Sequence, residues 1–147
     1  MSTVTVSPAT AVNNHRHFEN FLRYLFEGGA TPGDRVVVGP NGKPKNMDAD
    51  ELKSAKTKVR GFVTWYTEKV AKQPKGAWKD MCKNVGRNIV EVTDATAELG
   101  DEDFDELWQT FVNSARESKV AMPLCAVAHR NQEGRPDHIH MLWICKQ

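Results

Sequence analysis

The C-terminal segment from Met122 to Gln147 constrains the fold most, because it reads as two β-strands joined by a polar turn. Its second half carries His138 and His140 on either side of one isoleucine. Side chains two residues apart on a strand project from the same face, so this spacing predicts two imidazoles side by side. The first half adds His129, which a hairpin would fold back towards the pair. We therefore predict three histidines within reach of one point.

Three histidines in this arrangement predict a metal site with open coordination positions. Neutral imidazole is the commonest protein ligand of divalent transition metals. The competing interpretation is structural, because a histidine on a strand is often simply hydrogen-bonded within the sheet. A second His-x-His pair, His15 and His17, begins a predicted helix, where residues two apart diverge. We interpret that pair as surface residues.

Composition excludes several classes of protein. The 147 residues suit a single domain, and 39% hydrophobic with 27% charged residues is typical of a globular chain. No apolar run is long enough to span a bilayer, and the N-terminus lacks the features of a secretory signal. The three cysteines, Cys82, Cys125 and Cys145, form no Cys-x-x-Cys pair. They indicate buried thiols in a reducing, intracellular compartment.

Hydrophobic periodicity predicts an α+β fold, in which helices pack on an antiparallel sheet that carries the C-terminal hairpin. Short alternating or β-branched runs predict strands at Val4–Val6, Arg35–Val38 and Ile89–Val92. Apolar residues at helical spacing predict helices from Asn14 to about Glu27, from Asp48 or Asp50 to about Lys72, from Ala77 to Val85, and from Asp103 through Ala115.

The formal net charge of +1 conceals a basic region from Lys43 to Arg87 and an acidic region from Glu91 to Glu106. Cations recur at three- and four-residue spacing in two rows, which are Lys53, Lys56 and Arg60, and Lys75, Lys79, Lys83 and Arg87, with Trp78 alongside the second. Such rows match the closely spaced phosphates of nucleic acid, and a tryptophan can stack on an unpaired base. The competing interpretation is a solvated helix face, with the tryptophan in the core.

The His138-Ile139-His140 triplet, followed by apolar Met141 to Ile144, resembles the His-hydrophobe-His strand of HUH endonucleases. More narrowly, it resembles the N-terminal nickase domain of parvovirus-type replication initiator proteins. The resemblance implies that this strand is central in the sheet and that the preceding strand supplies a third ligand. His129 stands in about that place, and Glu133 in the turn is the alternative. The resemblance also implies a magnesium or manganese ion and a tyrosine that attacks single-stranded DNA.

Two departures from the family pattern affect these expectations. The third ligand in this family is usually a glutamate. A histidine in that place makes the site similar to the three-histidine sites of conjugative relaxases. It also favours manganese, zinc or nickel over magnesium. The chain also ends seven residues after His140, before the place where initiators carry their tyrosine. Either the chain is a fragment, or the nucleophile is upstream as in relaxases, or there is none.

Tyr24 and Tyr66 are the only tyrosines. Tyr66 and Lys69 form a Tyr-x-x-Lys sequence similar to the nucleophile motif of circular-DNA initiators, which makes Tyr66 a candidate catalytic residue. However, Tyr66 shares an apolar helix stripe with Phe62 and Val70, and such a stripe normally faces inward. Core packing is therefore the favoured role for Tyr66.

The resulting hypothesis is a metal-dependent nickase and DNA-binding domain, alone or as the N-terminal part of a larger protein. It would initiate replication of a small single-stranded DNA virus or related element, inside the cell and, for a virus, in the host nucleus. Its partners would be single- or double-stranded DNA, not a membrane, with self-assembly left open. Two alternatives remain: a non-enzymatic nucleic-acid-binding domain with a structural metal or none, and a protein-interaction domain that docks through the acidic residues 101–106.

Overall fold

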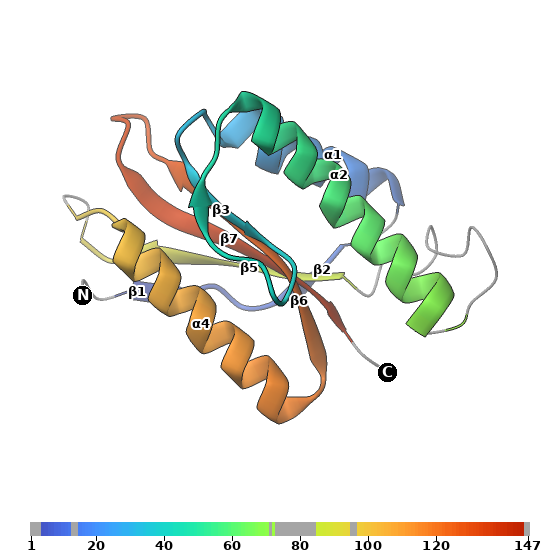
Figure 1. The fold of residues 1–147 in the computed structure, drawn as a ribbon. Helices are drawn as coiled ribbons and strands as arrows, with labels where there is room; N and C mark the ends of the chain where they lie inside the picture. The colour runs from blue at the N-terminus through green and yellow to red at the C-terminus, as the bar shows by residue number, and fades with distance from the viewer. Residues whose placement is uncertain (1–3, 13–14, 71, 73–84, 95–96, 146–147) are drawn as a thin grey trace.

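The structure is a computed structural model that describes the chain except residues 1–3, 13–14, 71, 73–84, 95–96 and 146–147. The predicted α+β fold is confirmed, as a seven-stranded antiparallel sheet with helices packed on it (Figure 1). The strands are β1 (Val4–Val6), β2 (Thr10–Ala11), β3 (Arg35–Val38), β4 (Lys45–Asn46), β5 (Val85–Val92), β6 (Ala121–Arg130) and β7 (Pro136–Cys145). The helices are α1 (His15–Arg23), α2 (Ala49–Trp65) and α4 (Asp101–Ser118), and the π-helical segments η1 (Tyr24–Gly29) and η2 (Tyr66–Val70) continue α1 and α2.

The histidine-bearing strand β7 lies in the middle of the sheet. The strand order is β1-β5-β7-β6-β3-β4, and β2 pairs with β5 next to β1. Strand β7 pairs with β6 on one side, and on the other side with β5 from Val85 to Glu91. Because both neighbours hydrogen-bond to it, β7 is held more firmly than an edge strand would be. It is therefore a rigid platform for side chains that must keep a fixed geometry.

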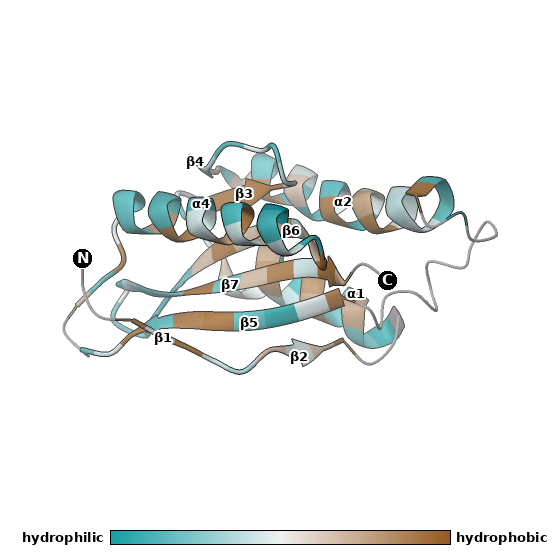
Figure 2. Ribbon diagram, turned by 90° about the horizontal axis from the view of Figure 1, so that it is seen from below, coloured by the Kyte–Doolittle hydropathy of each residue, from teal (hydrophilic) through white to brown (hydrophobic). Residues whose placement is uncertain are grey.

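Two hydrophobic cores lie on opposite faces of the sheet. Helices α1 and α2 cover one face and α4 covers the other (Figure 1). The first core contains Phe18, Leu22, Leu25, Val59, Leu124 and Leu142, and the second contains Phe104, Trp108, Val112, Ala126, Ile139 and Met141. Alternation along β7 therefore sends Leu142 to the α1 and α2 side, and Ile139 and Met141 to the α4 side. Figure 2 shows the matching mixture of hydrophilic and hydrophobic residues along α2 and α4.

Most helix boundaries follow local rules. Asp48 caps α2: its side chain accepts a hydrogen bond from the Glu51 backbone amide, and the Glu51 side chain accepts one from the Asp48 amide. Helix α4 begins at Asp101, two residues before the predicted start, and has three acidic residues in its first turn, where the helix dipole favours them. None of the helices in the described part of the chain is both long and apolar enough to cross a membrane.

The segment before β5 departs from expectation where it can be compared. The predicted helix from Ala77 falls mostly outside the described residues, but its last residue, Val85, begins strand β5. That strand is longer than the predicted Ile89–Val92, because it pairs with β7 continuously from Val85 to Glu91. The predicted contact residues Lys75, Trp78, Lys79 and Lys83 also lie outside the described residues, as does Cys82.

Candidate metal centre and the adjoining pocket

The three histidines of the C-terminal hairpin converge on one point. His129 and His138 are direct cross-strand partners, and His140 lies two residues further along the same face of β7. Their ring centroids are 4.5 to 5.4 Å apart, and one nitrogen from each ring lies within 4.8 Å of the others. This spacing could hold a metal ion. The alternative third ligand, Glu133, lies in the turn and pairs with Arg135 instead.

Hydrogen bonds fix which nitrogen of His129 and of His138 can bind a metal. The Nε2 of His129 lies 3.0 Å from the carbonyl oxygen of Leu25 in η1. A carbonyl only accepts, so Nε2 carries the hydrogen and the lone pair is on Nδ1. The Nδ1 of His138 lies 2.6 Å from a carboxylate oxygen of Asp137, which leaves Nε2 as its ligand atom. Such outer hydrogen bonds commonly orient histidines that bind metals.

Burial keeps two of the rings neutral. His129 is 1% exposed and His140 is 4% exposed. Burial lowers the pKa of His140 to about 3, with further lowering by the neighbouring His129, His138 and Arg87. Burial also lowers the pKa of His129. Both rings are therefore neutral at physiological pH, which is the form that binds metal.

Two nitrogens of the cluster are buried without a hydrogen-bond partner among the described residues. They are Nδ1 of His129 and Nε2 of His140. For His129, this is the nitrogen that the Leu25 hydrogen bond leaves with a lone pair. An unpaired buried polar atom costs about 1 to 3 kcal/mol, so such atoms are uncommon unless something binds them. The donor set therefore fits a metal ion.

Tyr24 lies against the cluster, although its role was not singled out by the sequence. Its ring contacts those of His129 and His140 edge to face, at centroid distances of 5.3 and 5.6 Å. Tyr24 is 47% exposed. It is the first residue of η1, and π-helical turns of this kind frequently occur at functional sites. The available signal was its three-residue spacing from Phe21, which places both rings on one helix face.

A pocket of about 580 Å³ opens beside the cluster. Its walls include Phe21, Tyr24, Arg87 and His140, and the connection between β1 and β2 closes one side. The guanidinium carbon of Arg87 lies 4.6 Å from the Phe21 ring centroid. Arg87 is thus the one residue of the predicted basic rows, within the described part of the chain, that lines this pocket.

Two of the three cations in the predicted α2 row form ion pairs with α1 and η1. Arg60 donates two hydrogen bonds to the carboxylate of Glu19 on α1, at 2.8 and 2.6 Å. Lys56 donates to Glu27 on η1 at 2.7 Å. Lys53 remains exposed. Two members of this predicted phosphate-binding row therefore hold α2 to the neighbouring helix.

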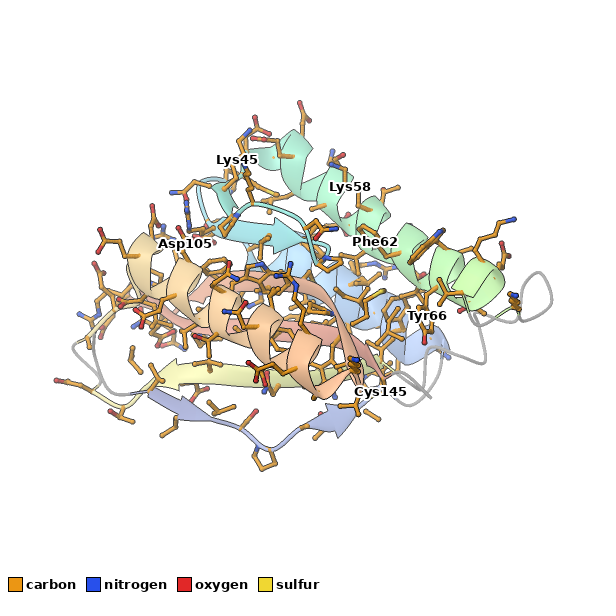
Figure 3. All side chains as sticks on the ribbon, turned by 60° about the horizontal axis from the view of Figure 1, so that its bottom comes forward. Lys45, Lys58, Phe62, Tyr66, Asp105 and Cys145 are labelled. Carbon is orange, nitrogen blue, oxygen red and sulfur yellow. The ribbon has the colours of Figure 1, made fainter. Side chains whose placement is uncertain are left out.

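Tyr66 lies in the hydrophobic core. It is 8% exposed and belongs to the cluster that contains Val59 and Val63 (Figure 3 marks it at the end of α2). A nucleophile has to reach a phosphate that arrives from solvent, and Tyr66 does not offer its side chain there. This placement matches the core-packing interpretation, and we do not retain Tyr66 as an attacking group.

Comparisons of the chain with known protein families, proteins and structures found no relative. No family model, no curated protein and no solved structure matches the chain.

Proposed function

We propose that the protein binds a divalent transition-metal ion through His129, His138 and His140 and cleaves single-stranded DNA at that site. The observation that carries the proposal is the convergence of three imidazoles whose ligand nitrogens lie within 4.8 Å of one another. Three neutral donors favour manganese, zinc or nickel over magnesium. We take manganese as the first probe because it also suits phosphoryl chemistry.

The electrostatics favour an anionic substrate. Three neutral ligands leave the double positive charge of the ion uncompensated, and Arg87 adds another positive charge near His140. A phosphodiester supplies the complementary negative charge. The bound ion would polarise a phosphate oxygen and so stabilise the charge that develops in the transition state. Arg87 would hold the neighbouring backbone by donating hydrogen bonds to phosphate oxygens.

Tyr24 is the attacking group in this proposal. Its half-exposed ring contacts two of the three proposed ligands, whereas the other tyrosine is in the core. The phenolic oxygen would form a bond to phosphorus while the bond from phosphorus to the 3′ oxygen breaks. The phenol proton would reach that leaving oxygen through solvent, so the products are a 5′ phosphotyrosine and a free 3′ hydroxyl.

The test combines metal titration with a cleavage assay. We expect calorimetry to show manganese binding by the wild type, no binding by the His138→Ala, His140→Ala double variant, and unchanged binding by His17→Ala, which lies outside the cluster. Manganese should then support cleavage of single-stranded oligonucleotides with a covalent protein-DNA adduct, and Tyr24→Phe should form no adduct. Equal metal affinity in the wild type and the double variant would defeat the assignment.

The burial of His129 and His140 favours one other function, a nucleic-acid-binding domain with structural zinc. Closed, buried sites are typical of structural zinc. In that case zinc would raise the thermal stability strongly, DNA would bind with a marked salt dependence, and no cleavage would occur with any metal. The same titration and assay therefore separate the two functions.

A further inference from the structure

We propose that the pocket beside the histidine cluster holds one unpaired nucleobase of the strand whose phosphate the metal binds. This inference rests on the proposed function and names how the substrate is selected. The pocket of about 580 Å³ is within the usual range for sites that bind small organic groups. Because His140 forms part of its wall, a base in the pocket would be adjacent to a phosphate at the metal.

The pocket offers the two kinds of contact that a base requires. Its walls are largely apolar and aromatic, with Phe21, Tyr24 and Ile89 contributing. Arg87 lies over Phe21, and guanidinium groups commonly stack on unpaired bases. The Nε of Arg87 is buried and has no hydrogen-bond partner in the described part of the chain. A base acceptor would supply that partner.

Strand alternation decides which polar groups of β5 face the pocket's metal side. Arg87 pairs with Leu142 and Ile89 pairs with His140, so both point to the histidine face of the sheet. Asn88 also borders the pocket, but it pairs with Met141, so its side chain points to the opposite face, towards α4. Its buried amide oxygen therefore does not contribute to base recognition here. Arg87 is the polar group on which the inference depends.

A consequence follows for the choice of substrate. A base that is stacked and paired in a duplex cannot enter a pocket bounded by a sheet, a helix and the β1–β2 connection. Entry requires the base to turn out of the stack, which is least costly for single-stranded nucleic acid. The pocket would therefore make the site selective for unpaired strands without any contact to a second strand.

The experiment uses a variant that fills the pocket. Thr10 is exposed on β2, pairs with Arg87 and lines the pocket, so Thr10→Trp should occupy it without a change in the core. The matched control is Val6→Trp on β1, which is 59% exposed and pairs with Val90, so it points to the other face. Anisotropy would compare labelled single-stranded oligonucleotides with chains of equal length that lack all bases. Chelator would be present to prevent cleavage.

The wild type and Val6→Trp should bind the intact strand about tenfold more tightly than the abasic chain, because one stacked base contributes that much. Thr10→Trp should lose this preference and keep the affinity for the abasic chain and for manganese. Equal binding of both chains by the wild type, or a preference that survives in Thr10→Trp, would overturn the inference. If the wild type binds manganese and cleaves DNA but binds the intact strand and the abasic chain equally, only the pocket assignment fails. If the wild type prefers the intact strand to the abasic chain but does not bind manganese, the proposed function is overturned instead.

Discussion

The backbone of Gly29 lies directly against the imidazole of His129. A Cβ atom at Gly29 would come within 2.2 Å of Cε1 and 2.6 Å of Nδ1 of that ring. Both distances are far below van der Waals contact, and Nδ1 is the nitrogen that we assign to the metal. The end of η1 therefore fixes the ring from one side, while the Leu25 carbonyl holds it through Nε2.

Gly29→Ala should disturb the metal site because the imidazole must move. We expect a fall of about 1 to 3 kcal/mol in the free energy of unfolding, as is usual when a packed site is overfilled. Manganese affinity should fall at the same time. Gly28→Ala is the matched control, since its Cβ would meet only Tyr24, at 3.9 Å. Calorimetry and thermal unfolding of both variants would check this, and equal metal affinity in the two would contradict it.

The stability of the metal-free protein should depend on pH through His140. Its folded-state pKa of about 3 is below the ordinary value of 6.5, so between these values the unfolded chain binds a proton that the folded chain does not. Stability is therefore complete above pH 6.5 and falls on acidification. The loss from His140 alone should be roughly 2 kcal/mol between pH 7 and pH 5.

Urea unfolding at pH 7 and pH 5, in the presence of chelator, would measure this dependence. Carboxylates with lowered pKa values, such as Glu51, lose their contribution only below their ordinary value of 4.5 and so do not enter this range. In His140→Leu the free energy of unfolding should depend less steeply on pH, because the buried titrating group is gone. The same pH dependence in wild type and variant would show that His140 does not control how stability changes with pH.

Asp34 stabilises the turn that leads from η1 to β3. Its carboxylate is 2% exposed and accepts hydrogen bonds from the backbone and hydroxyl groups of Thr31 and, at 2.5 Å, from Nε of Arg130. Arg130 directly follows His129. Asp34→Ala should cost about 2 to 3 kcal/mol, since the acid is buried while its guanidinium partner is partly exposed. Asp34→Asn should cost less, and denaturant unfolding of both would test this order. A loss of similar size in the two would mean that packing, not hydrogen bonding, sets the cost.

The histidine cluster was predictable because its residues follow the simplest local rule. The period of two puts His138 and His140 on one face, and a hairpin places His129 opposite without any knowledge of the other elements. Tyr24 and the pocket were not predictable in this way. They depend on how α1 and η1 lie across the sheet, which is set by packing between segments far apart in the chain. The same limit explains Lys56 and Arg60, whose helical spacing was correct but whose carboxylate partners lie on another helix.

Arg60 and Arg87 should differ in their effects, although both belong to the predicted basic rows. Arg60 is bonded to Glu19 across the α1–α2 contact, and Arg60→Ala should lower the free energy of unfolding by about 0.5 to 1 kcal/mol. The affinity of the Arg60→Ala variant for single-stranded DNA should stay the same as that of the wild type. Arg87→Gln should weaken DNA binding and reduce the slope of log affinity against log salt by about 0.7, the value for one phosphate contact on a single strand.

Anisotropy titrations at several salt concentrations, with thermal unfolding of each variant, would separate the two effects. The salt slope is the decisive readout, because a loss of folded protein lowers the apparent affinity equally at every salt concentration and leaves the slope unchanged. A reduced slope in Arg60→Ala would show that the α2 row contacts phosphates despite its ion pairs. An unchanged slope in Arg87→Gln would show that Arg87 does not make the proposed phosphate contact.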